Sequence, residues 1–452
     1  MIAGAIAVSV GGLAAPSLAT SAGIVPGAVS ATPASGTPAL YPNGSTEQVR
    51  QLVPCGGTMY AVGTFTSISQ GGTVYTRNNI FSFSETTPFG VTSWDPNVNG
   101  IVNSIAFNGT DCSQAYIGGK FTSVGGTAAT NIAEISTSTG AVNTSFGHNA
   151  GGQVETLLGY NNHILAGGYY KTINGSTANP YMTSLDPTTG QDDGFIQLGI
   201  SGNYHFCNST GTCTGGNPTR VYNQQLSHGG TLDLVEGDFT SVGGLQREQI
   251  FMLDLSGATA SVTGWTSPEF DGSQPQSTSL YQCWFSEPFY LQAASWSPND
   301  SQIYVATTGF HPWNLPTGSF PRSGLCDAAA AFPATQASVH HTWINYTGCD
   351  SLFSTAADNT NAYFGGHERW TENPDGCDFA GTGAIAEKGM EGLSPSNGLV
   401  TSNPPVYTRG RGSGADDMLL TIAGLWIASD NAQSTDSCGG IHGHSGICFL
   451  PY

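Results

Sequence analysis

The chain has 452 residues, of which only 9% are charged, and 31 acidic against 11 basic residues give a formal net charge of -20. Binding to nucleic acid or to anionic lipid surfaces needs clustered lysine and arginine, so this composition argues against both. The length would suit two or three ordinary domains, but in a repeat protein every unit adds to one body.

The N-terminal region, residues 1–31, resembles a secretion signal. Ile2 to Ala15 is an apolar stretch of small residues, and Ala19–Ala22 and Val29–Ala31 both suit cleavage. No basic segment precedes the stretch, which a start codon assigned too far downstream would explain. A weak membrane anchor is the alternative, but the stretch is short and glycine-rich for a membrane span. We therefore expect a secreted, extracellular protein without membrane insertion.

A short phrase recurs along the rest of the chain. It is clearest in Tyr116-Ile-Gly-Gly-Lys-Phe-Thr-Ser-Val-Gly-Gly, and weaker copies follow towards the C-terminus. Such periodicity indicates a repeat architecture. The apolar residues that open the seven copies are Tyr60, Tyr116, Leu165, Leu234, Tyr304, Tyr363 and Trp426.

The second unit shows the internal pattern. Residues 102–107 alternate as a strand, 114–119 form a buried small-residue strand, 130–136 alternate again, and 141–146 make a short fourth strand. Four short antiparallel strands per unit are typical of a propeller blade. We therefore predict an all-β, seven-bladed β-propeller of four-stranded antiparallel blades over residues 48–452. A β-helix has shorter repeats, and a sandwich would not repeat one phrase seven times.

The phrase from Tyr116, then Asn131-Ile-Ala-Glu-Ile, then Thr139-Gly-Ala-Val-Asn-Thr-Ser-Phe146, resembles the delta-60 repeat family of secreted bacterial β-propellers. The resemblance covers residues 55–255 and is weak beyond them. It implies a secreted propeller and no settled activity, because the family is largely uncharacterised.

The two ends of the chain predict how the ring closes. The last unit offers three strands before Tyr452, one fewer than a full blade. Residues 32–47 have the composition of a linker, but Thr37–Pro42 is apolar at its centre. We predict that Thr37–Pro42 supplies the missing outer strand, because closure removes exposed strand edges.

Long connections are unevenly distributed. With the strands of a blade named A to D from the axis outward, the B–C and D–A connections leave one face and the A–B and C–D turns leave the other. Residues 199–220 and 270–289 are predicted D–A connections, and 309–327, 366–382 and 430–445 are predicted B–C connections. Loops on a rigid repeat are common binding elements. This long-connection face is the predicted binding face.

Aromatic and polar side chains concentrate in these connections. Rings beside polar groups suit sugar faces or protein side chains, although they also pack long loops against each other. The candidate ligand-binding residues are Tyr204, Trp284, His311, Trp313, His367, Arg369 and Trp370.

Ten cysteines, all after residue 54, fit an oxidising compartment. Their places in the predicted blades suggest one pairing among many possible ones. It joins Cys55 with Cys112, Cys207 with Cys213, Cys283 with Cys326, Cys349 with Cys377, and Cys438 with Cys448. No Cys-x-x-Cys spacing supports a zinc site instead.

Signals for catalysis and metal binding are weak. His367, Glu368 and Arg369 form the most charged group in any connection, and acid–base work on a glycan is one hypothesis for them. A salt bridge between Arg369 and Glu368 is the simpler one. His442 and His444 are spaced to chelate a metal, but two histidines alone are a poor signal. We expect no cofactor, no metal and no settled catalytic role.

The sequence therefore favours a secreted, monomeric propeller that binds an extracellular glycan or protein through its long-connection face. A propeller enzyme, hydrolase or lyase, acting on glycans is the alternative, and a structural cell-envelope protein is a third.

Overall fold

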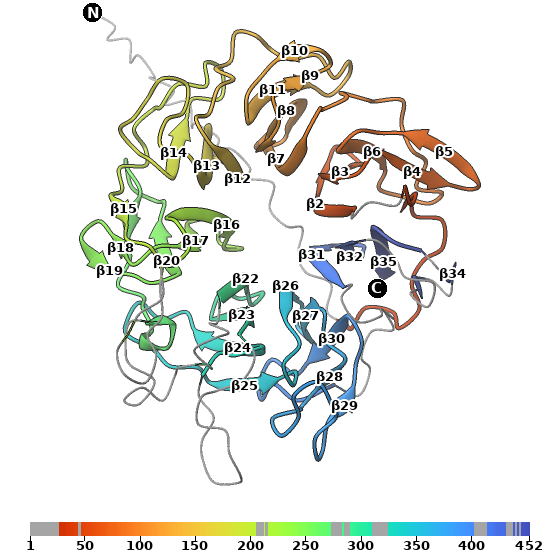
Figure 1. The fold of residues 1–452 in the computed structure, drawn as a ribbon, viewed down its shortest axis with the longest axis vertical. Helices are drawn as coiled ribbons and strands as arrows, with labels where there is room; N and C mark the ends of the chain where they lie inside the picture. The colour runs from red at the N-terminus through yellow and green to blue at the C-terminus, as the bar shows by residue number, and fades with distance from the viewer. Residues whose placement is uncertain are drawn as a thin grey trace, which may run out of the picture.

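The computed structural model describes residues 27–43, 47–204, 212, 216–272, 283, 290–309, 324–401, 414–430, 437–438, 441–442 and 444–452. Figure 1 shows these residues as antiparallel sheets set like blades around a central axis. The fold is an all-β propeller, as predicted. One short 3-10 helix, Pro268–Phe270, is the only helix in the described part. No helix there is long and apolar enough to cross a membrane.

Seven sheets radiate from the axis, and each has its A, B and C strands in sequence order. Their bounds are β2 Gln48–Cys55, β3 Thr58–Thr64 and β6 Ile80–Ser84; β7 Ile101–Asn108, β8 Asp111–Lys120 and β11 Ile132–Ser136; β12 Gln153–Tyr160, β13 His163–Tyr169 and β14 Met182–Leu185; β16 Arg220–Leu226, β17 Leu232–Asp238, β20 Ile250–Asp254 and β21 Ser261–Val262; β22 Tyr290–Trp296, β23 Gln302–Thr308, β24 Ala328–Pro333 and β25 Trp343–Tyr346; β26 Leu352–Ala357, β27 Ala362–Gly366 and β30 Met390–Leu393; β31 Ala415–Thr421, β32 Gly424–Ser429 and β35 Ile447–Pro451.

The A strands stand next to one another around the axis. Strand β2 contacts both β7 and β31, so the first sheet meets the second and the last and the ring is closed. The last sheet therefore has a neighbour on both sides, because β31 also contacts β26.

The predicted four-stranded blades are only partly present. Among the described residues, two sheets have a fourth strand, β21 or β25. In four others the fourth strand is reduced to a single bridge. These bridges are Phe83–Val91, Ile135–Val142, Leu185–Asp192 and Leu393–Val400.

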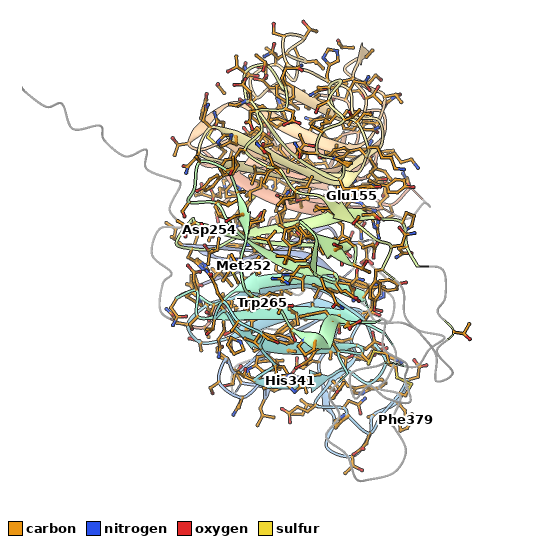
Figure 2. All side chains as sticks on the ribbon, turned by 90° about the vertical axis from the view of Figure 1, so that its left-hand side faces the viewer. Glu155, Met252, Asp254, Trp265, His341 and Phe379 are labelled. Carbon is orange, nitrogen blue, oxygen red and sulfur yellow. A yellow bond between two sulfur atoms is a disulfide. The ribbon has the colours of Figure 1, made fainter. Side chains whose placement is uncertain are left out.

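Small hairpins extend the connections on the long-connection face, and Figure 1 shows them at the periphery of the ring. Their strands are β1 Ala39–Leu40, β4 Ser67–Gln70, β5 Thr73–Thr76, β9 Ser123–Val124, β10 Thr127–Ala128, β15 Ile200–Ser201, β18 Ser241–Val242, β19 Leu245–Gln246, β28 Trp370–Thr371, β29 Ile385–Ala386, β33 Ser437–Cys438 and β34 Ile441–His442. Figure 2 shows the disc edge-on, with Asp254, which ends a C strand, and Phe379, in a B–C connection, on opposite sides.

The residues that hydrogen-bond to the last sheet through their backbone lie nearer the N-terminus than the predicted closing strand Thr37–Pro42. The backbone N–H of Ser30 donates to Pro451 (2.6 Å) and that of Ala34 to Phe449 (2.8 Å), both in β35. Residues 39–40, within the predicted closing strand Thr37–Pro42, instead pair as β1 with β4 of the first unit. The ends of the chain do meet: the backbone bonds to β35 come from residues before Thr37, and Thr37 reaches β35 through its side chain, whose Oγ1 donates to Ile447 O at 3.0 Å.

The repeated phrase supplies the packing between sheets. All seven of its opening residues are buried, with 0% to 5% of their surface exposed. In the last blade Trp426 stacks on Phe449 with ring centroids 4.3 Å apart. The same buried cluster contains Phe83 of the first blade, so these rings pack neighbouring sheets against each other.

Four of the five predicted disulfides are present. They are Cys55–Cys112, Cys283–Cys326, Cys349–Cys377 and Cys438–Cys448. The first joins the first two blades at their short turns. Cys207 and Cys213 lie outside the described residues.

Candidate ligand-binding cavity on the ring axis

Every A strand contains one extra residue at the same place. The pairing of each A strand with its B strand shifts register there, which is a β-bulge, and a bulge redirects the side chain that it carries. The seven bulge residues are Arg50, Asn103, Glu155, Tyr222, Gln292, Phe353 and Asp416.

The bulges explain a glycine of the repeated phrase. Gly119 pairs with Val102, the residue before the bulge of β7. A Cβ atom on Gly119 would lie 2.1 Å from the carbonyl oxygen of Ile101, which no side chain permits. A Cβ atom would lie equally close, 2.0 to 2.3 Å, to the equivalent carbonyl oxygen at four other glycines of the phrase: Gly63, Gly168, Gly237 and Gly366. The glycine is therefore required by close backbone approach, not by its own flexibility.

The bulge residues surround a cavity of about 720 Å³ on the axis. All seven A strands line it, and all seven bulge side chains are among the lining residues. Asn217, Asp238, His367 and Asp430, at the long-connection ends of their strands, border it as well. The cavity therefore lies towards the long-connection face, and its size is that of ordinary small-ligand sites.

One side of the cavity holds an ion-paired group. Arg220 Nε donates to Asp238 Oδ2 at 2.7 Å, and Arg220 Nη1 lies 3.7 Å from Glu155 Oε1. The guanidinium also stands over the ring of Tyr222, 5.3 Å from its centroid. Burial raises the pKa of both Asp238 and Glu155, and the charge of Arg220 partly offsets that rise.

The other side holds three carboxylates. Burial, helped by the negative charge of Asp430, raises the pKa of Asp416 to about 7, while Gln48, His367 and Arg50 act in the opposite direction. Asp417 accepts the backbone N–H of Leu52 at 3.1 Å, and burial raises its pKa to about 6. His367 Nε2 is 3.9 Å from Asp430 Oδ2, which is too long for a hydrogen bond.

Four buried oxygen atoms of the lining have no hydrogen-bond partner in the described part of the chain. They are Asn103 Oδ1, Gln224 Oε1, Asp238 Oδ1 and Asp416 Oδ2. The Asn103 amide is oriented by its Nδ2, which donates to Val154 O at 2.9 Å, so its oxygen is left as the open group. All four are acceptors, and a buried acceptor without a partner costs about 1–3 kcal/mol. The cavity is therefore suited to a ligand rich in donors.

Two predicted binding residues take different positions. His367 lines the cavity. Tyr204 has no exposed surface, and its ring packs edge-on against Tyr290 at 5.5 Å, so it supports the wall and does not reach a ligand. Trp284, His311 and Trp313 lie outside the described residues.

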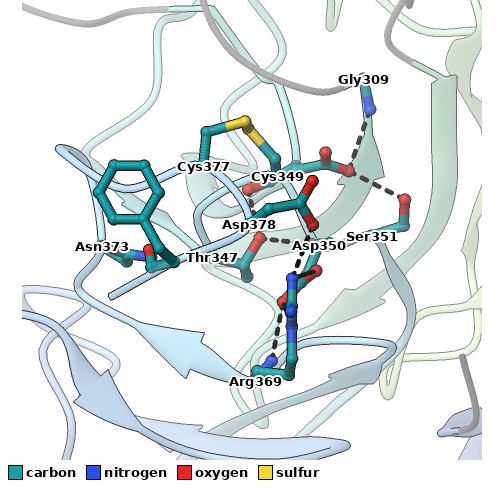
Figure 3. The surroundings of a disulfide bond; sticks show 11 residues. Gly309, Thr347, Cys349, Asp350, Ser351, Arg369, Asn373, Cys377 and Asp378 are labelled. Atoms are coloured by element: carbon teal, nitrogen blue, oxygen red, sulfur yellow. Dashed lines mark hydrogen bonds and ion pairs between the residues drawn. A yellow bond between two sulfur atoms is a disulfide. The ribbon is translucent and has the colours of Figure 1, made fainter. Parts of the chain in front are cut away.

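The predicted salt bridge between Arg369 and Glu368 is wrong. Arg369 donates to both oxygens of Asp350, at 2.7 and 2.6 Å, and to Asp378 at 2.9 Å, beside the Cys349–Cys377 disulfide (Figure 3). Its guanidinium also covers the ring of Trp370 at 4.4 Å. Arg369 and Trp370 therefore hold the connection together.

Glu368 faces away from this group. It is 1% exposed, and burial together with the charge of Glu391 raises its pKa well above the usual range. His367, Glu368 and Arg369 consequently do not converge on one point, which removes the geometric basis for acid–base catalysis by this trio.

Of the two histidines named as weak metal candidates, only the side chain of His444 lies within the described residues. His444 is buried, and its Nε2 lies 3.1 Å from Thr37 Oγ1 and 2.9 Å from Ile447 O, so it fastens the N-terminal segment to the last blade. The side chain of His442 is outside the described residues. No group of three potential metal ligands occurs among the residues that the structure describes.

Sequence reasoning looked to the long connections and missed the bulge residues. A signal for them exists, because each A strand contains near its start an apolar residue, then a variable one, then a small or polar one. Val102-Asn103-Ser104 and Val154-Glu155-Thr156 are two examples. The middle position varies in charge, size and polarity, which is unusual within a repeated core strand.

Comparisons with known proteins do not assign the chain to a family. No family model matches the chain, and no curated protein matches it. Similar solved structures include the WD40 β-propeller domain of Doa1, at 10% identity over 93% of this chain and 95% of that one, with a TM-score of 0.44. Another is BamB from Moraxella catarrhalis, at 10% identity over 90% and 98%, with a TM-score of 0.41.

Proposed function

We propose that this protein is an extracellular carbohydrate-binding propeller that takes a sugar unit into the axial cavity from the long-connection face. The observation that carries the proposal is the set of four buried acceptors without partners on the cavity wall. Sugar hydroxyl groups are donors, and a donor that reaches a buried acceptor supplies the hydrogen bond that this acceptor lacks within the protein.

The remaining lining suits the same ligand. Tyr222, Tyr290 and Phe353 place aromatic rings in a wall otherwise dominated by amides and carboxylates. Aromatic rings provide apolar area for the C–H face of a sugar, while amides fix its hydroxyl groups. Disulfides in four places fit an oxidising compartment, where extracellular glycans are found.

A glycan array probed with the purified protein, followed by calorimetry on the sugars it retains, tests the proposal. Asn103→Ala and Gln224→Ala are expected to weaken binding at least about tenfold each, because each removes one open acceptor. Asn108→Ala is the matched control, since Asn108 ends the same strand β7 at the opposite face. It is expected to bind as the wild type does.

Two results would overturn the proposal. One is an array on which no sugar is retained; retention of a protein partner alone has the same meaning. The other is sugar binding that is unchanged in both cavity variants, which would move the site to the outer connections.

A further inference from the structure

We propose that the sugar unit bound in the cavity carries a protonated amino group, held by Asp416 and Asp430. This inference rests on the proposed carbohydrate binding and names the class of sugar: a free amino sugar in preference to its hydroxyl or acetamido counterpart.

The charge on the cavity wall is the first support. Five carboxylates line the cavity, against two guanidinium groups and His367. Arg220 is already engaged by Asp238 and Glu155. The opposite side therefore presents Asp416, Asp417 and Asp430 with only Arg50 and His367 to balance them, and a cation is favoured there.

The position of Asp416 is the second support. It is a bulge residue, so its carboxylate is directed to the axis, where its Oδ2 is buried and without a hydrogen-bond partner in the described chain. An ammonium group supplies both a donor for this oxygen and a positive charge. Charge-assisted hydrogen bonds of this kind are about twice as strong as neutral ones.

Asp430 completes the seat. Its Oδ1 accepts the backbone N–H of Gly414 at 3.1 Å, which fixes the carboxylate. Its Oδ2 lies 3.9 Å from His367 Nε2, beyond hydrogen-bond distance. The negative charge of Asp430 acts on Asp416, so the two carboxylates repel each other when both are ionised. A cation between them relieves that repulsion, whereas a neutral hydroxyl group does not.

The test uses an array on which gluco-, galacto- and manno-configured oligosaccharides each appear in hydroxyl, amino and acetamido form. In at least one series, the amino form is expected to bind about tenfold more tightly than the other two. Measurements at about 0.5 M salt separate a seated amine from loose attraction to an acidic surface, because such salt screens exposed charges.

Asp416→Asn and Asp430→Asn are expected to bring the amino and hydroxyl forms to within about twofold of each other, because each variant removes one of the two carboxylate charges that favour the ammonium group. Asp111→Asn is the control, because Asp111 is an exposed carboxylate at the short-turn face. It is expected to keep the wild-type preference.

Equal binding of the three forms by the wild type would overturn this inference and leave carbohydrate binding in place. A preference that survives in both aspartate variants, or that disappears at high salt, would also overturn it. A preference that requires added calcium would assign the carboxylates to a metal instead. Failure of every sugar in every form would overturn the proposed function itself.

Discussion

The connection between β27 and β30 and the wall of the axial cavity are both polar, but they differ in how far their polar atoms are hydrogen-bonded within the protein. In the connection, Arg369 forms ion pairs with Asp350 and Asp378. The Asn373 side chain donates from Nδ2 to the carbonyl oxygen of Phe379 and accepts the backbone N–H of Gly381 at Oδ1. On the wall, four buried oxygens remain open. The connection has an aromatic and charged composition that suggests a binding surface, yet those residues stabilise the loop.

The difference shows that composition alone does not locate a binding site. A polar group that is satisfied within the protein contributes to stability, whereas a buried one left open costs free energy until a ligand or water satisfies it. Three substitutions test whether the two regions separate structure from binding in this way.

Gly119→Val is expected to have the largest effect. A side chain there collides with the backbone oxygen of Ile101, which must move to admit it. We expect the free energy of unfolding to fall by more than about 4 kcal/mol, measured by chemical denaturation. Gly90→Ala is the control, because no atom lies within 4 Å of a Cβ on Gly90. Normal stability in Gly119→Val would show that the bulge is not fixed by this glycine.

Arg369→Ala is expected to come second. It leaves the Asp350 carboxylate, whose side chain is 5% exposed, without its partner, so stability should fall by about 3 kcal/mol. Ligand binding at the cavity should be unchanged. Arg50→Ala is the complement, since Arg50 is an exposed residue of the cavity wall. It should change sugar affinity and shift stability by less than about 0.5 kcal/mol. If Arg369→Ala abolished sugar binding in a folded protein, the connection would belong to the site.

Glu391→Gln is expected to have the smallest effect and the opposite sign. Burial raises the pKa of Glu391 to about 8, above its value in the unfolded chain. The folded protein therefore holds a proton that the unfolded chain releases, and the wild type loses stability as the pH rises from about 4 through 8. The variant should be more stable than the wild type at pH 8, by on the order of 2 kcal/mol, with little difference at pH 4.

Glu391 and Glu368 are buried carboxyl groups outside the cavity whose oxygens have no hydrogen-bond partner in the described chain. The Glu391 variant therefore tests whether such a group costs free energy where no ligand is expected to bind. A loss of stability at pH 8 on substitution would mean that the ionised carboxylate is stabilised by a group of opposite charge. Denaturant unfolding at pH 4 and pH 8 measures both outcomes.

Much of the scaffold could be predicted from the sequence. The recurring phrase carries large residues at Tyr60 and Trp426 that must be buried and a glycine that backbone approach requires, and such local needs leave a visible period. The disulfide between Cys55 and Cys112 could be anticipated because both lie beside the A–B turns of adjacent units. The cavity could not be predicted so readily, because it depends on register shifts that place residues from seven distant segments around one axis.

Two of the binding residues predicted in the connections were wrongly assigned because their contacts, too, depend on the three-dimensional fold. Tyr204 and Arg369 have the chemistry of binding residues, and only three-dimensional contacts show that Tyr290 and Asp350 engage them. Sequence indicates which side chains are available, but not which of them the fold has already used.

The ring of bulges has an evolutionary consequence. Each blade offers one position that lies outside its paired ladder, so substitutions there change the lining of the cavity while the repeated glycines and large apolar residues continue to specify the scaffold. Seven such positions, one from each blade, could diversify independently of one another. A nearly symmetric frame can therefore enclose an asymmetric interior.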